Sequence, residues 1–286
     1  MKQPPFLAPP QVIKAIAPAG VVTAEPALAQ GVEIWQAQGY RLELPGTRTP
    51  WHYLAGRDGE RWQELAESWG QYPALVVARG GYGTMRLLSH LGELGEGCPW
   101  VIGFSDATAL LWSLATHKQI MSIHAPVLLT LAETTAAAQA VLFDLLGGRL
   151  KNFTLQGLPW HQGRAEGRLL PGNLTVATHL LGTPFIPPWQ DIILALEDVA
   201  EPPYKIDRML TQWHLSGYLQ QVKGIALGDF GSHPLMDTIL EERLQNLGIP
   251  VVAHLSFGHI AGNFPLVVGA RCILDGDRGE LSWYLD

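Results

Sequence analysis

The sequence has little of what marks several large classes of protein. Its two cysteines, Cys98 and Cys272, lie far apart and match no C-x-x-C or mixed Cys/His spacing, which argues against a disulfide framework and a zinc motif. No run of lysine or arginine is long enough to follow a phosphate backbone, and the formal net charge is -7, so nucleic acid is not an expected partner. The chain also lacks an uncharged run of membrane-spanning length and a signal-peptide core. We therefore expect a cytoplasmic protein that does not associate with membranes.

Apolar residues are abundant, and in the first half of the chain they alternate between strand-like and helix-like patterns. Hydrophobic residues make up 47% of the 286 residues, enough for one large domain or two modest ones. We expect strands at 12–17, 41–44, 74–78, 100–104 and 121–127, and helices at 25–39, 60–69, 107–117 and 134–146. Because strands that are apolar on both faces lie between helices, this half is predicted to be an α/β fold with a doubly wound parallel sheet.

The pattern changes after residue 150. Glycine, proline and polar residues make 151–167 resemble an irregular linker between domains at 1–150 and 168–286. In the second part we expect strands at 192–196, 222–227, 250–255, 264–274 and 280–285, a short helix beginning near Asn173, and one substantial helix around 206–213. The carboxyl-terminal domain is therefore predicted to be smaller and rich in strands.

Ser105 lies where the strand at 100–104 meets the helix at 107–117. A serine on a sharp strand-to-helix turn projects its hydroxyl beyond the sheet, and the backbone N–H groups that follow point into the same space. That arrangement presents a nucleophile beside an oxyanion hole, although the G-x-S-x-G form would need glycine at Ala107. The alternative is that Ser105 or Asp106 simply caps the helix.

A glycine-rich turn follows the strand at 74–78. Arg79, Gly80, Gly81, Tyr82 and Gly83 precede another helical pattern, and glycine lets backbone N–H groups approach a ligand closely. The turn could form a phosphate cradle, an oxyanion hole or only a tight connection. Its spacing fits neither the dinucleotide fingerprint nor the P-loop. Ligands of open α/β sheets bind at the carboxyl ends of the strands, where Gly80, Gly81 and Ser105 are all expected.

The second half contributes acidic residues and a histidine. Glu197 and Asp198 end the strand at 192–196, and His259 follows the strand at 250–255. With Ser105 they supply a nucleophile, a base and a carboxylate that could orient the base. The alternative is that Glu197 and Asp198 form a solvated strand end and that His259 is an ordinary loop residue.

Several blocks of the chain, in order, resemble the serine LD-carboxypeptidases that trim cell-wall tetrapeptides and the related microcin C immunity hydrolases. The resemblance covers nearly the whole chain and rests on residues 16–20, 79–88, 103–108, 172–184, 196–210 and 257–270. It implies a flavodoxin- or amidotransferase-like domain that carries the nucleophile, and a second domain that carries the acid and the histidine.

The resemblance also implies residue roles. Ser105 matches the nucleophile, Glu197 the carboxylate and His259 the general base, while the backbone N–H groups of Gly81 and Asp106 would form the oxyanion hole. Candidates for substrate binding are Arg79, Gly80 and Tyr82, with Arg86 a further carboxylate partner.

The expected activity is release of D-alanine from a murein tetrapeptide, free, nucleotide-linked or as a muropeptide, with no metal or cofactor and with a homodimer as a family-level expectation. One alternative is cleavage of aminoacyl- or peptidyl-nucleotide conjugates, with the Trp51–Tyr53 loop as a source of stacking. Another is a small-ligand binding module without catalysis.

Overall fold

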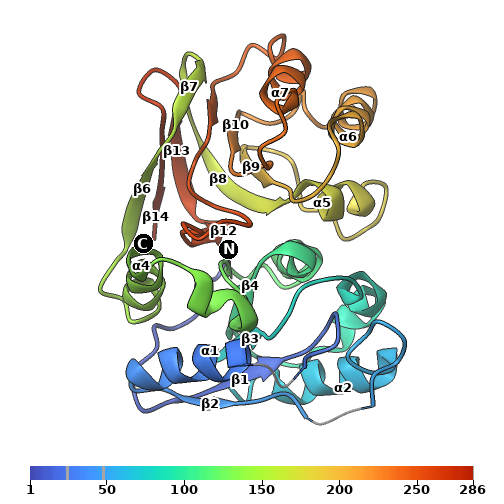
Figure 1. Cartoon of the computed structure of the whole chain (residues 1–286), viewed down its shortest axis with the longest axis vertical. Helices are drawn as coiled ribbons and strands as arrows, with labels where there is room; N and C mark the ends of the chain where they lie inside the picture. The colour runs from blue at the N-terminus through green and yellow to red at the C-terminus, as the bar shows by residue number, and fades with distance from the viewer. Residues whose placement is uncertain (24–25, 47–48, 286) are drawn as a thin grey trace.

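The computed structural model describes residues 1–23, 26–46 and 49–285, which form two β-sheets, one belonging mainly to each half of the chain (Figure 1). The amino-terminal sheet has the order β12-β5-β4-β3-β1-β2. Its strands are β1 (Val12–Ile16), β2 (Arg41–Glu43), β3 (Ala74–Val77), β4 (Trp100–Gly103), β5 (Ser122–His124) and β12 (Leu266–Val268). The first five pair in parallel, and β12, from the far end of the chain, pairs antiparallel with β5.

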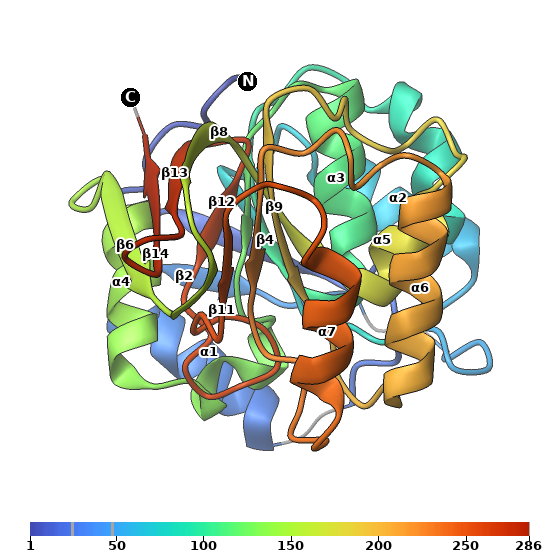
Figure 2. The same ribbon diagram turned by 90° about the horizontal axis from the view of Figure 1, so that it is seen from above.

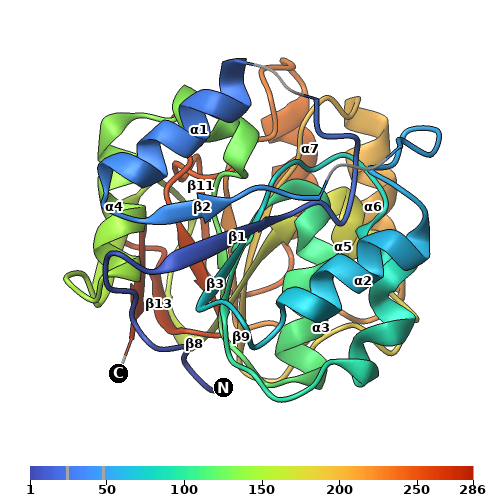
Figure 3. The same cartoon turned by 90° about the horizontal axis from the view of Figure 1, so that it is seen from below.

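Helices cover both faces of this sheet, as the doubly wound prediction requires. They are α1 (Pro26–Ala37), α2 (Asp58–Ser68), η1 (Thr84–Glu93), η2 (Ser105–Ala107), α3 (Thr108–His117), η3 (Leu128–Glu133) and α4 (Ala136–Leu146), with η marking 3₁₀ helices. Leu75 and Val77 of β3 share one apolar cluster with Leu65 of α2, whereas Val76 belongs to another with Trp35 of α1. Accordingly, α1 and α2 lie on opposite sides of β1 and β2 in Figure 3. The predicted α/β class is confirmed.

The second sheet has the order β6-β14-β13-β8-β9-β10-β11-β7. Its strands are β6 (Asn152–Gln156), β7 (Leu158–His161), β8 (Arg164–Asn173), β9 (Ile192–Glu197), β10 (Gly224–Leu227), β11 (Val251–Ala253), β13 (Arg271–Asp275) and β14 (Glu280–Tyr284). Strands β8 to β11 are parallel, and antiparallel pairs flank them. Helices α5 (Leu174–Leu180), α6 (Pro203–Leu215) and α7 (Met236–Leu244) complete this half, and Figure 2 shows α6 and α7 side by side.

The structure corrects the expectation that 151–167 is irregular, because this stretch contains β6, β7 and the start of β8. The glycine and proline residues that suggested a linker allow tight connections between these strands. A Cβ on Gly157 would lie 2.4 Å from the carbonyl oxygen of Ala253, so glycine permits the close approach. Pro159 lies in β7, an edge strand, where a missing N–H is tolerated. The position of the domain boundary stays a prediction.

In the second half, one further expectation was wrong and one helix was not predicted. The apolar run 264–274 is not one strand, because the chain turns at Gly269, which has φ 84°, and passes from β12 in one sheet to β13 in the other. Helix α7 was missed, because its sequence shows little separation of apolar from polar faces, and its buried residues are Met236, Leu240 and Leu244.

The two halves pack where β8 ends against the start of α3. The indole N–H of Trp112 donates to the carbonyl oxygen of Pro171 at 2.7 Å, and the backbone N–H of Asn173 donates to Oγ1 of Thr108 at 3.0 Å. Gly172 is required between them, since a Cβ there would lie 2.7 Å from Cγ2 of Thr108. This junction anchors the turn that carries Ser105 against the second sheet.

Candidate active site

Ser105 lies on a strained turn at the carboxyl end of β4. Its φ is 60°, a left-handed conformation that is unfavourable for a residue with a Cβ. The fully buried β4 fixes the chain before it, and Gly103 has no room for a side chain, because a Cβ there would lie 3.0 Å from atoms of Val77 and Ala107. The glycine-rich turn packs against Ser105: a Cβ on Gly80 would lie 3.2 Å from its Oγ.

Asp106 does not cap the helix that follows it, contrary to the capping alternative. The residue before α3 is Ala107, which offers no side-chain cap. The buried Asp106 carboxylate instead accepts a 2.9 Å hydrogen bond from the backbone N–H of Thr84, at the start of η1. Burial raises the pKa of Asp106, while its hydrogen bonds with Thr84 oppose that rise. The Asp106 side chain therefore ties the serine turn to the glycine-rich turn.

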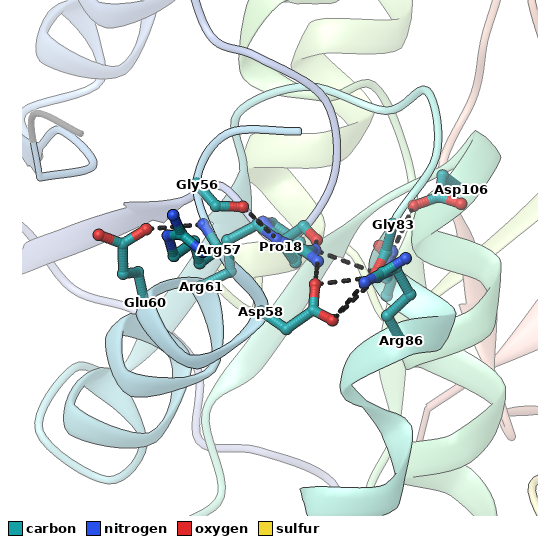
Figure 4. A network of polar contacts seen from close by, with 10 residues as sticks. Pro18, Gly56, Arg57, Asp58, Glu60, Arg61, Gly83, Arg86 and Asp106 are labelled. Carbon is teal, nitrogen blue, oxygen red and sulfur yellow. Dashed lines mark hydrogen bonds and ion pairs between the residues drawn. The ribbon is translucent and has the colours of Figure 1, made fainter. Parts of the chain in front are cut away.

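A buried guanidinium binds the end of the glycine-rich turn (Figure 4). Arg61 donates to the carbonyl oxygens of Gly56, Pro18 and Gly83, and pairs with the carboxylate of Asp58. Gly83 has φ 134° and no space for a Cβ. Nothing in the sequence marks this role for Arg61, because one arginine in an amphipathic helix looks like a solvated residue.

His259 and Glu197 form a short polar contact in the site. Nδ1 of His259 donates to Oε2 of Glu197 at 2.6 Å, and the Glu197 carboxylate at the end of β9 is fully buried. Gly258 makes this contact possible: its φ is 108°, and a Cβ there would lie 2.8 Å from Cβ of Glu197. The amide oxygen of Asn263 accepts from the Gly258 N–H at 3.0 Å and so holds the loop.

The environment of His259 favours its protonated form. Burial by itself lowers the pKa of the imidazole, but the hydrogen bond and charge of Glu197, together with the charges of Asp198 and Asp229, raise it above the ordinary histidine value. Since Nδ1 is committed to Glu197, Nε2 is the atom left to accept a proton.

Ser105 and His259 line one cavity of about 360 Å³. Arg79, Gly80 and Gly81 form another part of its wall. Within the described residues no hydrogen bond joins Ser105 Oγ to the imidazole, a looseness common before substrate binds. The structure thus brings together the serine, the histidine and the glycine-rich turn, with the acid directly behind the histidine.

The candidate binding residues divide into two groups. Arg79 lines the cavity, and its Nη1 donates to the carbonyl oxygen of Val21 at 2.7 Å. Arg86 does not line it, since two of its nitrogens bind the carboxylate of Asp58. Tyr82 is 49% exposed, with its ring centroid 5.8 Å from that of Tyr53. Tyr53, in the loop that the sequence offered as a source of stacking, is 63% exposed.

A second histidine lies behind the site. His124 is fully buried between the rings of Phe104 and Phe257, with centroids 6.0 and 6.2 Å away, and neither ring nitrogen has a partner within the described residues. Burial lowers its pKa to about 4, so it is neutral at pH 7. Sequence reasoning missed this residue, and it missed Asn263, because nothing in their spacing marks them.

In residues 1–23, 26–46 and 49–285, no group of three or more histidine, cysteine, aspartate or glutamate side chains is arranged to hold a metal ion. No helix in these residues is long and apolar enough to span a membrane.

Both halves of the chain match known domain patterns. The fold and the side chains define a class of α/β protein in which a serine and a carboxylate-oriented imidazole share a cavity. The pattern of the LD-carboxypeptidase N-terminal domain matches residues 13–125, and that of the LD-carboxypeptidase C-terminal domain matches residues 166–274. The chain belongs to the LD-carboxypeptidase family, as the sequence blocks predicted.

Individual relatives agree. A Synechocystis sp. protein that carries a provisional carboxypeptidase name is 44% identical over 98% of this chain and 97% of its own length. The murein tetrapeptide carboxypeptidase of Pseudomonas aeruginosa is 31% identical over 92% of this chain and 94% of its own.

Solved structures give the same fold. The muramoyltetrapeptide carboxypeptidase of Oxalobacter formigenes has a TM-score of 0.85 and 28% identity over 95% of this chain and 97% of its own. The microcin C7 self-immunity protein MccF in complex with aspartyl sulfamoyl adenosine has a TM-score of 0.85 at 21% identity, and covers 98% of both chains.

Proposed function

We propose that this protein is a serine LD-carboxypeptidase that releases the terminal D-alanine of murein tetrapeptides. The observation that carries the proposal is the 2.6 Å contact between His259 and the buried Glu197, at the edge of the cavity that Ser105 also lines. The family membership supports the substrate class, and relatives named as murein tetrapeptide carboxypeptidases lie near 30% identity.

The proposed mechanism begins with attack of Ser105 Oγ on the carbonyl carbon of the LD bond, while Nε2 of His259 takes the hydroxyl proton. Glu197 holds the tautomer with Nε2 unprotonated and stabilises the imidazolium that forms. The negative oxygen of the tetrahedral intermediate would accept from the N–H groups of Gly81 and Asp106, each contributing about 3 kcal/mol to lowering the barrier.

The second half of the cycle returns the enzyme to its starting state. The His259 imidazolium donates its proton to the D-alanine amine as the C–N bond breaks, which leaves an acyl group on Ser105. A water molecule then attacks the ester with His259 again as base, and the tripeptide leaves with a new carboxylate. Arg79, on the same cavity wall as Gly81, is a proposed partner for a substrate carboxylate.

The test is mass spectrometry of the protein and its Ser105→Ala variant with a murein tetrapeptide and its all-L counterpart. We expect only the unmodified protein to release one D-alanine, and only from the LD-linked peptide. Equal turnover by Ser105→Ala would overturn the assignment of the nucleophile.

A second candidate function is hydrolysis of aminoacyl-nucleotide conjugates. The exposed pair Tyr53 and Tyr82 favours it, because Tyr82 directly follows Gly81 and an exposed aromatic ring can stack on a nucleobase. Cleavage of an aspartyl sulfamoyl adenosine analogue, with the murein peptide left intact, would put this function first.

A further inference from the structure

A carboxylate lies in the candidate active site that the proposed mechanism does not use. Glu133, the last residue of η3, has an exposed side chain that lines the cavity with Ser105 and His259. It also lines an adjoining hollow of about 260 Å³, where Ile260 and Ala261 form part of the wall. Phe104, Thr130, Glu133 and His259 border both spaces. Glu133 therefore stands at the passage from the catalytic cavity to a second space large enough for another part of a substrate.

Among the described residues, Glu133 is paired with no cationic side chain. Within residues 1–23, 26–46 and 49–285, no ion pair or side-chain hydrogen bond involves its carboxylate. Among the described residues that line the two hollows, Glu133 is the only carboxylate and Arg79 the only side chain with a permanent positive charge. A site that contains one unpaired charge of each sign matches a ligand that carries both a carboxylate and an ammonium group.

We propose that Glu133 binds the side-chain ammonium group of the third residue of the peptide and so selects a diamino acid beside the scissile bond. This inference rests on the proposed function, in which the acyl part of the substrate ends in that residue. Bound substrate would displace water from the passage, and a charge-assisted hydrogen bond is stronger there than at an open surface. The overall charge of -7 attracts any cationic peptide weakly and at long range. Selectivity between peptides is therefore determined by the carboxylate of Glu133.

The test uses two LD-tetrapeptides that differ only at the third residue, which is L-lysine in one and Nε-acetyl-L-lysine in the other. Binding is measured by calorimetry on Ser105→Ala protein, so that turnover does not interfere. We expect the lysine peptide to bind about tenfold more tightly, and we expect the added change Glu133→Gln to bring the ratio of the two dissociation constants close to one.

Glu241→Gln is the matched control. Glu241 is an exposed glutamate of α7 that lines neither hollow, so its change removes the same unit charge and should leave the ratio unchanged. An unchanged ratio in the Glu133→Gln protein, or no preference in the starting protein, overturns the proposal.

Cleavage by proteins with Ser105 intact separates this proposal from the proposed function. If both peptides are cleaved and Glu133→Gln leaves the ratio of their kcat/KM values unchanged, the function stands and the role of Glu133 is wrong. If binding shows the Glu133-dependent preference but no peptide is cleaved, the role of Glu133 stands and the proposed reaction fails. If neither peptide binds, both the proposed function and the proposed role of Glu133 are overturned.

Discussion

At the scale of single residues, the site depends on what surrounds each titratable group. Glu197 and His259 are ordinary residues in the sequence, and burial of one against the other gives them their proposed chemistry. The sequence marks Ser105 more clearly, because a strand, a serine and a helical pattern are contiguous. Asn263 and Arg61 have no such signal. Asn263 binds a backbone N–H of its own loop, and Arg61 binds the carbonyl oxygen of Gly83, which is distant in sequence.

The pKa of His259 can be measured directly. We expect its imidazole to titrate above the ordinary histidine value in an NMR pH series, because the Glu197 carboxylate favours the imidazolium. The Glu197→Gln change should lower that pKa. A His259→Gln protein identifies the resonance, and titration at or below the ordinary value would contradict the expectation. Because the base must be neutral, kcat/KM should rise with pH through this raised pKa.

At the scale of elements, the strand ends determine where the chemistry lies. Gly80 and Ser105 follow the paired strands β3 and β4 of the first sheet, and Glu197 ends β9 of the second sheet. His259, which binds Glu197, lines the same cavity as Gly80 and Ser105. The sequence predicted β1, β3 and β4 because each is a short, largely apolar run, and it missed α7 because that helix lacks a distinct apolar face.

The loop after β11 offers a prediction at this scale. In Gly258→Ala, a residue with φ 108° would gain a Cβ 2.8 Å from Glu197, so the loop must move and carry His259 with it. A shift near 1 Å can cost about 100-fold in rate, which is the fall in kcat/KM we expect.

Gly262→Ala is the control in the same loop. Its new Cβ would make only an ordinary 3.8 Å contact with Ser256, so activity should be retained. Equal activity of the two variants would show that the geometry at Gly258 does not matter.

At the scale of the whole molecule, the site lies between two sheets that share one packed interior. Trp112 of α3 and Leu174 of α5 belong to the same apolar cluster, and β12 carries the carboxyl-terminal part of the chain into the first sheet. Packing, rather than neighbourhood in the sequence, thereby places Ser105 in the same cavity as His259.

The buried His124 should make the stability of the fold depend on pH. It is fully buried with a pKa of about 4, whereas the unfolded chain takes up a proton near pH 6.5. The free energy of unfolding should therefore fall as pH drops from 6.5 toward 4.

Urea unfolding at pH 7 and pH 5 measures the effect. Between these values wild type should lose about 2 kcal/mol more stability than His124→Leu, which cannot titrate. The other histidines contribute equally to both proteins, so identical losses would mean that the pKa of His124 is not depressed.

The sequence by itself determined the α/β order of the first half, the turns at Gly80 and Ser105, and the family, because these depend on local periodicity and on contiguous residues. Tertiary structure alone decided that 151–167 joins a sheet, that Asp106 binds Thr84 rather than its own helix, and that Glu133 lines the same cavity as His259. Each of these contacts joins segments brought together only by packing, and the free energy that selects them comes from burial of the whole interior.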